Sequence, residues 1–476
     1  MKLLLALVAL VQLIASCVPN SPSAPPDAQL PGVYRGDAST AASLGNVPWR
    51  ELYDDPVLQG LIQKALAHNF NVEIAYTNIL QAEANLGITA ANQSVFVNGV
   101  VQAPYDATTG SKAPGTPSSQ FLPLAGITAN YQVDLFGKLA SATGSARNQL
   151  LSTQAAFETV LATVVAEVAT AYFQLRELDQ VLAFTQSAVT VREKNVRLMT
   201  LRVQGGESSM QDQRQAEQSL YEVSQNVPAL KQSIAQTENA LAVLTGDYPH
   251  DIQRGLTLER QIKMPALPQT GVASELLQRR PDIRQAEYAI AAAAGNVDVA
   301  RKLLYPSITL GASAAVGGQI INGEAIKAPI PILTPINGAF YGPLGLFSIV
   351  AQLLQPIFNG GQIRSQIHLA EAQKQQIAVS YLQTVHRAFQ EVSDDITSYN
   401  ELRLRTTQLE LYERASLDSV RLAMERYENG YTSYLEVLDA QTREYQAQTD
   451  VAQGHLNERL ALVQLYLALG GGWQTQ

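Results

Sequence analysis

"LRVQGGESSMQD" at residues 201–212 and "ERYENGYTSYLE" at residues 425–436 are the two most informative stretches of this chain. A shift of 224 residues aligns them, placing Arg202 on Arg426, Gly206 on Gly430, Ser209 on Ser433 and Asp212 on Glu436. The same shift places Gly246 on Gly470, so the helices that follow the two stretches have equal lengths. Because agreement at two distant points is not expected by chance, we interpret the chain as an internal duplication.

Each half contains the same order of predicted elements: helix, strand, loop, strand, long helix, tight turn and long helix. Strands are indicated where apolar residues alternate, as at Ile127, Ala129, Tyr131, Val133 and Leu135. Polar or Pro/Gly-rich loops are expected between the two strands of each half. The predicted segments are a first repeat at 55–246 (hairpin about 95–136, long helices about 138–204 and 208–245), a connector at 247–270, a second repeat at 271–470 (hairpin about 305–358, long helices about 362–428 and 432–467) and a tail at 471–476. Pro228 is expected to kink the helix at 208–245.

The long helices carry apolar residues at alternating steps of three and four, as at Leu435, Leu438, Tyr445 and Ala452. Such a heptad pattern predicts a partner in coiled-coil geometry, and the tight turns make that partner the adjacent antiparallel helix. The two predicted strand pairs would have open edges, which a membrane barrel built by several chains would close. The alternative is a pair of helical hairpins that simply stand in solvent.

The composition excludes several classes of function. The chain has 476 residues and a formal net charge of −9, and it contains no basic run, which argues against a nucleic-acid surface. Its five histidines form no metal-binding pattern, and the sequence has no nucleotide-binding loop and no Gly-x-Ser-x-Gly motif. We therefore predict a protein that is not an enzyme and that has no metal or nucleotide cofactor.

The first seventeen residues resemble a bacterial lipoprotein signal. Residues 1–16, "MKLLLALVALVQLIAS", have the length and flanks of a secretory signal rather than of a membrane-spanning helix. The only cysteine, Cys17, follows two small residues and can form no disulfide within the chain. We predict a signal peptide at 1–16, a diacylglycerol and palmitoyl lipid on Cys17, and a lipidated tether at 17–54. The alternative is an ordinary signal peptide with an incidental cysteine.

The whole pattern resembles the TolC family of outer-membrane factors, and within it the NodT-like and OprM-like lipoproteins. The resemblance is carried by "DLFGKL" (134–139), "ELLQRRPDIRQAE" (275–287), "LYPSITL" (304–310), "PIFNGGQIRS" (356–365), "RYENGYTSYLEVLDAQ" (426–441) and "LALGGGW" (467–473). In the first repeat, "NQSVFVNG" lacks the proline of "LYPSITL".

This resemblance implies a mainly α-helical homotrimer in the bacterial outer membrane, lipid-anchored and extending into the periplasm. Four strands from each chain would make a twelve-stranded barrel above a coiled-coil tunnel. Residues near 50–60, residues 246–282 and the C-terminus would form a belt around the middle of the tunnel. The expected partners are a periplasmic adaptor protein, an inner-membrane pump of the RND type and outer-membrane lipid. The implied function is passive exit of small molecules through a duct that opens by an iris-like movement of its inner helices.

The candidate gate lies just after the second turn. Glu436 and Asp439 share a helix face, and three chains around one axis would place six carboxylates in a ring that attracts cations. In the family, acidic residues at these positions line the periplasmic constriction, and Tyr427 matches a position whose hydrogen bonds help to hold it shut. Thr432 stands where some members carry an Arg that forms an ion-pair latch. The alternative for both carboxylates is stabilisation of a helix N-terminus, worth about 0.3–1 kcal/mol.

The turn glycines Gly205, Gly206 and Gly430 are expected to adopt positive φ, and the resemblance implies that these turns meet the adaptor. Two other functions stay open: a duct for type I protein secretion, and a structural periplasmic coiled-coil lipoprotein. An enzyme is a third class, for which the sequence offers no site.

Overall fold

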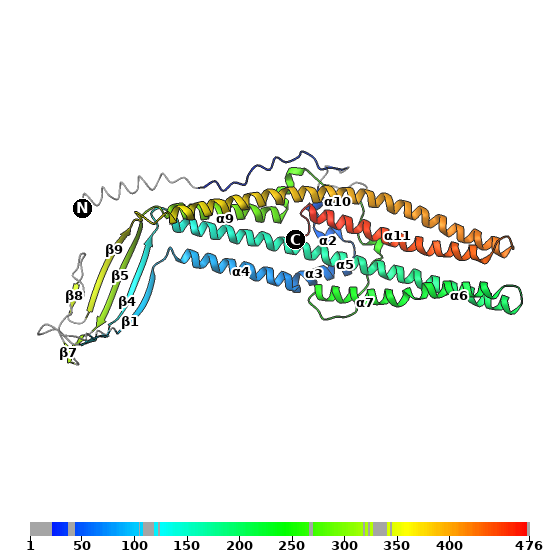
Figure 1. Ribbon diagram of the computed structural model, residues 1–476, viewed down its shortest axis with the longest axis horizontal. Coiled ribbons are helices and arrows are strands. Elements are labelled where there is room, and N and C mark those ends of the chain that lie inside the picture. The colour runs from blue at the N-terminus through cyan, green and yellow to red at the C-terminus, as the bar shows by residue number, and fades with distance from the viewer. Residues whose placement is uncertain are drawn as a thin grey trace. The chain divides into compact units, whose positions relative to one another are not determined.

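The computed structural model describes residues 21–36, 43–103, 105–107, 119–121, 124–265, 270–317, 319–321, 324–326, 340–342 and 345–473. Its contacts divide the chain into two compact units. Unit 1 comprises residues 1–26, 80–152 and 287–380, and unit 2 comprises residues 27–79, 153–286 and 381–476. Most of the described residues are helical, and α5 (Lys138–Gln204) and α10 (Gln362–Glu428) each contain 67 residues (Figure 1). These two helices begin and end where the sequence predicts.

Unit 1 contains an antiparallel sheet whose order is β1-β4-β5-β9-β8. The strands are β1 (Phe96–Gln102), β4 (Leu124–Val133), β5 (Ser307–Gly317), β8 (Phe340–Gly342) and β9 (Gly345–Leu354). The predicted pairs β1–β4 and β5–β9 are confirmed. The structure adds the pairing of β4 with β5, which joins a strand of the first half to a strand of the second.

The register gives this sheet two chemically different faces. Val97 pairs with Ala129, Ala129 with Ala312, and Ala312 with Ile349. Because side chains alternate along a strand, the residues in step with these four share one face. That face is apolar apart from one tyrosine hydroxyl and comprises Val97, Gly99, Val101, Ala125, Ile127, Ala129, Tyr131, Val133, Ile308, Leu310, Ala312, Ala314, Val316, Phe347, Ile349, Ala351 and Leu353. The opposite face carries polar residues such as Asn98, Thr128, Asn130, Gln132, Thr309, Ser313, Ser348 and Gln352.

A second, smaller sheet occupies part of the segments that were expected to be loops. Its strands are β2 (Tyr105–Ala107), β3 (Ser119–Phe121), β6 (Gln319–Ile321) and β7 (Glu324–Ile326), in the order β2-β3-β6-β7. The loop prediction is therefore wrong for these residues, because single-segment composition cannot register the pairing of β3 with β6 across the two halves. The family resemblance implies that Pro329, Pro331 and Pro335 lie at the outer mouth of the duct, and these three residues lie outside the described ranges.

The helices of unit 1 approach one another closely. The hydroxyl of Ser145 on α5 donates to the carbonyl oxygen of Ala292 on α9 (Pro281–Lys302) at 2.8 Å. A Cβ atom at Gly295 would lie 2.9 Å from the Cβ of Ser145, so only glycine allows this approach. The other helices that reach unit 1 are α4 (Phe70–Ala91) and the first part of α10.

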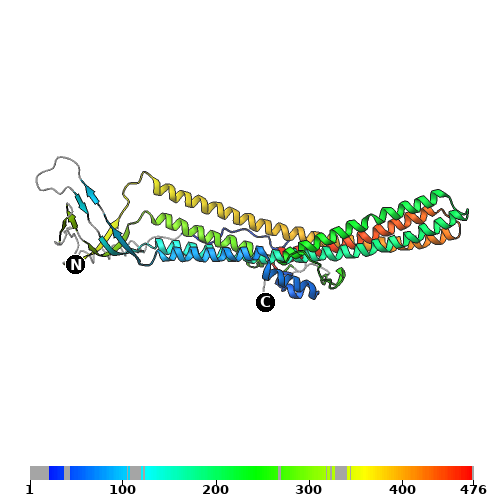
Figure 2. The ribbon, with the colours of Figure 1, turned by 90° about the horizontal axis from the view of Figure 1, so that it is seen from below.

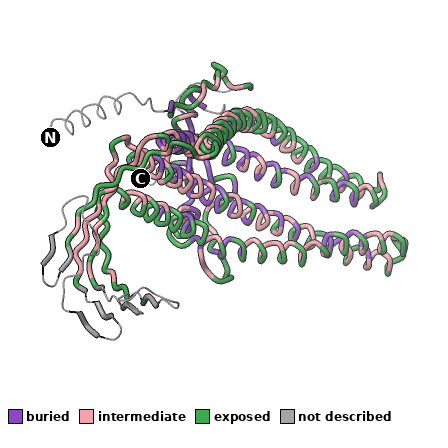
Figure 3. The backbone as a smooth tube through the Cα atoms, turned by 60° about the vertical axis from the view of Figure 1, so that its left-hand side comes forward, coloured by how far each residue is buried: buried purple, intermediate pink, exposed green. Residues whose placement is uncertain are grey.

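Unit 2 contains the buried core of the helical part. Its other elements are η1 (Leu44–Asn46), α2 (Trp49–Leu52), α3 (Pro56–His68), α6 (Met210–Ser224), α7 (Asn226–Leu244), η2 (Leu258–Arg260), η3 (Ala273–Glu275), α8 (Leu276–Arg279) and α11 (Tyr434–Ala468). From their turns, α6 returns along α5 and α11 returns along α10 (Figure 2). Buried residues are frequent on α5 and α11 in this unit, whereas none of the described strand residues of the large sheet is buried (Figure 3).

The helix predicted over about 208–245 is interrupted for one residue close to Pro228, where the sequence predicts a kink. α6 ends at Ser224 and α7 begins at Asn226, with Gln225 between them. Pro228 has no N–H to donate to the carbonyl of Ser224, four residues earlier, and its ring crowds that carbonyl. The irregularity therefore lies in the turn before the proline, at Gln225, which keeps right-handed helical angles.

The two tight turns use the same hydrogen bonds, displaced by 224 residues. The amide of Glu207 donates to the carbonyl of Arg202 at 2.8 Å, and the amide of Tyr431 donates to that of Arg426 at 2.9 Å. Gly206 and Gly430 have φ of +77° and +75°, as a helix end of this kind requires. Gly205 is not among the glycines with positive φ, so the prediction for that residue is wrong.

Candidate functional site

The end of α10 places Tyr427 against the end of α5. The guanidinium of Arg202 donates to the hydroxyl of Tyr427 at 2.5 Å, and its central carbon lies 5.0 Å from the centroid of the same ring. The contact thus combines a charged hydrogen bond with a cation–π interaction. It joins the last turn of the first long helix to the last turn of the second. Sequence reasoning singled out Tyr427 but used Arg202 only to align the repeats, so it missed the partner.

A small core behind Tyr427 holds this contact in place. Tyr434 at the start of α11 packs against Tyr427 with ring centroids 5.3 Å apart. The buried residues of this cluster are Met199, Ala216, Ala423, Tyr434, Val437, Leu438 and Ala440, which come from α5, α6, α10 and α11. Burial raises the pKa of Tyr434 above its usual range, so its hydroxyl stays neutral.

The two predicted gate carboxylates lie on the first turns of α11, and each has an arginine of its own chain. Arg426 approaches Glu436 to 2.7 Å, and the hydroxyl of Thr432 also donates to the Glu436 carboxylate. Arg443 lies 3.0 Å from the Asp439 carboxylate. In the protomer these carboxylates are therefore paired rather than bare. Ser433 makes no capping bond with its side chain, so stabilisation of the helix N-terminus through a capping box is absent here.

The first-repeat turn uses its acidic residue differently. The Ser209 hydroxyl accepts from the Asp212 amide at 3.2 Å, and the Asp212 carboxylate accepts from the Ser209 amide at 3.0 Å. These bonds hold the pKa of Asp212 below its ordinary value. Asp212 therefore caps a helix, whereas Glu436 at the aligned position is directed to Arg426 and Thr432.

Polar contacts continue between α5 and the helices beside it. Arg192 is 2% exposed, and its guanidinium donates to the carbonyl of Ser219 at 2.7 Å. Burial lowers the pKa of Arg192, with the nearby Glu222 opposing that effect. The amide of Asn195 donates to Gln441 at 3.1 Å. The bonds of Asn195 with Gln441 and of Arg202 with Tyr427 join the two helical pairs, whereas the bond of Arg192 with Ser219 lies within the pair of α5 and α6.

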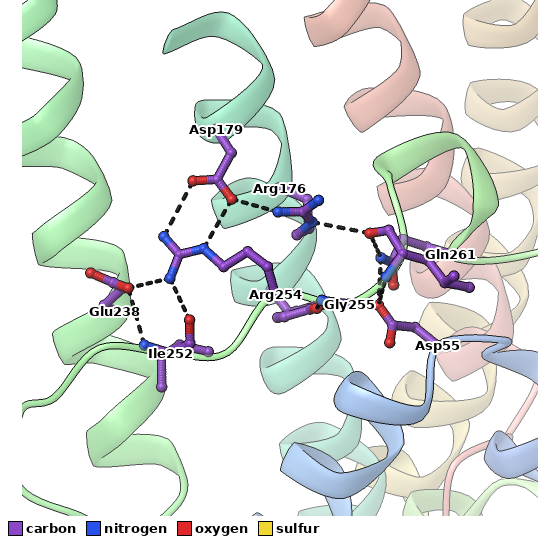
Figure 4. Close-up of polar contacts among 10 residues, drawn as sticks. Asp55, Arg176, Asp179, Glu238, Ile252, Arg254, Gly255 and Gln261 are labelled. Carbon is purple, nitrogen blue, oxygen red and sulfur yellow. Dashed lines mark hydrogen bonds and ion pairs between the residues drawn. The ribbon is translucent and has the colours of Figure 1, made fainter. Parts of the chain in front are cut away.

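A second polar cluster surrounds the fully buried Asp55, the N-cap of α3 (Figure 4). One carboxylate oxygen accepts from Tyr172 at 3.1 Å, from the Leu256 amide at 2.8 Å and from Gln261 at 2.8 Å. The other accepts from the Val57 amide at 2.8 Å. This one side chain fixes the start of α3 and the connector that follows α7.

Arg254 fastens the same connector to two long helices. Its guanidinium contacts both oxygens of Asp179 on α5, at 3.1 and 3.2 Å, and also the Glu238 carboxylate on α7 (Figure 4). Burial of Arg254 lowers its pKa, but the hydrogen bonds that its guanidinium donates to these carboxylates, together with their charges, outweigh that effect and raise the pKa overall. Sequence reasoning placed a belt here without identifying these residues, because their partners lie up to about two hundred positions away.

The "QRRPDI" motif forms a third cluster. Arg280 lies 2.7 Å from Asp282 and 2.8 Å from Glu391, and it donates to the carbonyl of Ala468 at 3.1 Å. A cavity of about 380 Å³ adjoins it and is lined in part by Asp395. Burial raises the pKa of Asp395 to about 6, with Glu391 and Asp394 adding to the effect and Arg280 opposing it.

Within the described ranges, no group of three or more His, Cys, Asp or Glu side chains could hold a metal ion. Cys17, the predicted lipid site, lies outside those ranges. Among the described helices, only α5 is long and apolar enough to cross a membrane, and half of its apolar window is buried inside the protein, as in a core helix.

Comparison with known proteins identifies the family. The model of the outer membrane efflux protein family matches residues 61–247 and 272–471, which together are most of the chain. The chain belongs to the outer membrane efflux protein family.

Individual relatives of this efflux family agree over nearly their whole lengths. The chain is 30% identical to a probable efflux pump outer membrane protein of Pseudomonas putida, TtgC, covering 100% of this chain and 96% of the relative. It is 26% identical to SilC, a probable outer membrane lipoprotein of Salmonella typhimurium, over 99% of each chain. Among solved structures, the open state of the Neisseria gonorrhoeae outer membrane channel MtrE has a TM-score of 0.83 and 26% identity, covering 96% of this chain and 99% of that one.

These findings confirm the predicted family and its general function. The protein is an outer-membrane efflux protein that serves as an exit duct of efflux pumps. The family consists of transport ducts rather than enzymes. The predicted roles of Glu436, Asp439, Tyr427, the turn glycines and Cys17 stay predictions.

Proposed function

We propose that three copies of this chain form a twelve-stranded barrel in the outer membrane and an α-helical tunnel in the periplasm. The observation that carries this proposal is the two-faced sheet of unit 1. Its β4, β5 and β9 strands have 10, 11 and 10 residues, the length at which a tilted strand spans a bilayer. One face is apolar and suits lipid, and the opposite face carries nearly all the polar side chains of these strands, among some apolar ones, and suits a wet lumen.

The edges of this sheet support association with further copies. In the part of the chain that the structure describes, β1 pairs with β4 alone, and β9 beyond Phe347 pairs with β5 alone. Unpaired strand edges cannot remain in lipid, since each unpaired backbone group costs several kcal/mol. Pairing of β1 with β9 of the next copy would close the barrel.

We propose an internal two-fold repeat for the chain. Both long helices have 67 residues and start 224 positions apart, and both turns share their hydrogen bonds at the same displacement. The glycines that follow the last helix of each half also agree, since Gly246 after α7 and Gly470 after α11 have φ of +76° and +82°.

The periplasmic gate is assigned to the turn after α10. Tyr427 would hold the inner helix pair to α5 through Arg202, and Glu436 and Asp439 would ring the constriction. Because each carboxylate is paired with an arginine, the ring would carry less net negative charge than six unpaired carboxylates. Opening would break the Arg202–Tyr427 contact and move the inner helices outward.

The assembly would work with a periplasmic adaptor protein, which meets the turns at Gly205, Gly206 and Gly430, and with an inner-membrane pump of the RND type. The substrates would be small toxic molecules or drugs, as the names of efflux relatives indicate for those proteins. Cys17 would carry a lipid that anchors the chain to the outer membrane, and SilC, a probable lipoprotein, supports this assignment.

Single-channel conductance of the purified protein in a planar bilayer tests the duct and its gate. The wild type is compared with the double variant Glu436→Ala/Asp439→Ala. A small, cation-selective conductance that rises or loses its selectivity in the variant supports both proposals. Equal behaviour of the two proteins removes the carboxylates from the gate but retains the duct. No conductance in either contradicts the proposed trimeric duct and favours the structural coiled-coil alternative.

A further inference from the structure

The chain directly after the predicted lipid site is held by polar contacts with two helices of unit 1. The amide of Ser21 donates to the Asp298 carboxylate on α9 at 2.7 Å, and Arg301 donates to the Ser21 hydroxyl at 3.2 Å. Lys374 on α10 donates to the carbonyl oxygen of Pro22 at 2.6 Å. Ser21 is only 7% exposed, although it lies in a segment without helix or strand. Both backbone groups and the hydroxyl are thus recognised at consecutive residues.

The helices that supply these contacts are themselves joined. Arg301 lies 2.7 Å from the Glu371 carboxylate, which links the last turn of α9 to the third turn of α10. Asp298 is 7% exposed, and a carboxylate so buried needs partners such as the Ser21 amide. We call Asp298, Arg301, Glu371 and Lys374 the α9–α10 cluster.

We propose that the α9–α10 cluster is a binding site for the segment that follows the acylated cysteine, and that it fixes the lipid anchor beside the strands. This inference rests on the proposed lipidation of Cys17. Cys17 precedes Ser21 by four residues, so a trans peptide chain keeps the two Cα atoms within about 14 Å. Ser307, the first residue of β5, follows Asp298 by nine residues, four of them helical, which spans at most about 24 Å.

Without the cluster the anchor would be poorly located. In unit 2 the next aromatic contact of the segment is Tyr34, whose ring lies 5.5 Å from that of Phe389. Seventeen residues separate Cys17 from Tyr34, a reach of up to about 60 Å, through a sequence rich in proline that adopts extended conformations. Binding of Ser21 and Pro22 therefore shortens the unbound segment between Cys17 and the rest of the protein about fourfold. A shorter segment raises the effective concentration of the strands at the leaflet that holds the lipid.

Protection of a thiol at residue 21 tests the site in the full-length protein in outer membranes. Cys17 is the only cysteine of the chain, and lipidation converts its thiol to a thioether, so Ser21→Cys carries one free thiol. Ser23→Cys, two residues further along and exposed, is the matched control. We expect a maleimide to label Ser21→Cys at least tenfold more slowly than Ser23→Cys. Equal labelling rates would overturn the inference.

Removing the cluster should expose the segment. Asp298→Ala or Lys374→Ala, added to Ser21→Cys, is expected to raise the labelling rate at least fivefold, and Lys374 is half-buried rather than part of the core, so its loss should leave the fold intact. Glu83→Gln, which changes an exposed carboxylate on α4, should leave the rate unchanged. A rate that stays low in both cluster variants contradicts binding by these residues.

Incorporation of an alkyne-tagged palmitate separates this inference from the proposed lipidation. Palmitate on the wild type but not on Cys17→Ala, together with slow labelling of Ser21→Cys, supports both. Palmitate incorporation with fast labelling overturns the binding site and keeps the anchor. No incorporation, with a free thiol at Cys17 in the wild type, overturns the lipidation and the inference that depends on it.

Discussion

Gly255 lies where no larger side chain fits, because a Cβ atom there would lie 2.1 Å from an oxygen of the buried Asp55 carboxylate. Gly255→Ala should therefore displace Asp55 from Tyr172, Leu256 and Gln261. Because the broken bonds are buried, we expect a loss of about 2–3 kcal/mol in the free energy of unfolding. This loss is measured by thermal unfolding of the purified protein, monitored by circular dichroism.

Gly60→Ala is the matched control for this substitution. Gly60 is an exposed residue inside α3, and a Cβ there meets nothing within 4 Å. Alanine in a helix interior should gain about 0.5–1 kcal/mol over glycine. Equal effects of the two substitutions would show that the Asp55 contacts do not stabilise the connector.

Asp395 is expected to make the folded protein less stable as the pH rises. Its pKa is raised to about 6 from the ordinary 3.8, so the folded protein binds this proton more tightly than the unfolded chain. Stability from this group is present below about pH 4 and is lost as the pH rises through 6. Asp395→Asn should therefore melt at a higher temperature than the wild type at pH 7.5 and at the same temperature at pH 3.5. Glu401→Gln, on an exposed part of α10, should show no such pH-dependent difference.

Among the helices, Pro228 lies close to the interruption between α6 and α7, whereas the matching segment of the proposed second repeat is the single helix α11. The shift of 224 residues aligns Pro228 with Ala452 in the continuous helix α11. Pro228→Ala restores an N–H that can donate to Ser224, so α6 and α7 should fuse. Amide hydrogen exchange should slow at residues 224–229. Pro281→Ala is the control, because Pro281 is the first residue of α9, where proline is already favourable, and no gain is expected.

We expect one added lysine to affect assembly differently on the two faces of the large sheet. Ile127 lies on the apolar face of β4 and Thr128, its neighbour, on the polar face. Ile127→Lys would place an ammonium group in lipid at a cost of about 2–4 kcal/mol near the midplane, whereas Thr128→Lys would place it in the lumen. The assembled, SDS-resistant form should be lost from outer-membrane fractions only for Ile127→Lys. Equal assembly of both variants would contradict the proposed barrel.

The sequence predicts elements well where the signal is local. The absence of proline between 138 and 204 and between 362 and 428 marks the long helices, and Gly206 and Gly430 mark their turns. The pairings that create the sites are not local. β3 pairs with β6 across about two hundred residues, Arg254 joins Asp179 and Glu238, and Arg202 joins Tyr427. No periodicity in one segment encodes such a partner, so these contacts required the structure.

In the whole chain, the proposed duplication leaves a difference between the two halves at their turns, because the aligned arginines bind different partners. Arg202 and Arg426 occupy aligned positions, yet Arg202 binds Tyr427 of the other half while Arg426 binds Glu436 of its own half. The position aligned with Tyr427 in the first half is Val203, which has no hydroxyl to accept such a bond. The Arg202–Tyr427 bond therefore joins the ends of the two long helices once. The reverse bond, from Arg426 to residue 203, cannot form because Val203 has no hydroxyl group.

This asymmetric contact gives a final prediction for the conducting assembly. Tyr427→Phe removes the hydroxyl that accepts from Arg202 but keeps the ring under the guanidinium, and Arg202→Ala removes both interactions. If the contact holds the proposed gate shut, single-channel conductance in a planar bilayer should rise in the order wild type, Tyr427→Phe, Arg202→Ala. The loss of one charge-assisted hydrogen bond, about 1.5–3 kcal/mol, corresponds to roughly a tenfold to hundredfold larger open population. Tyr431→Phe, an exposed tyrosine at the same turn, should conduct like the wild type. Unchanged conductance in Arg202→Ala, with the helices still folded by circular dichroism, would show that the Arg202–Tyr427 contact only packs the helices and that the gate lies elsewhere.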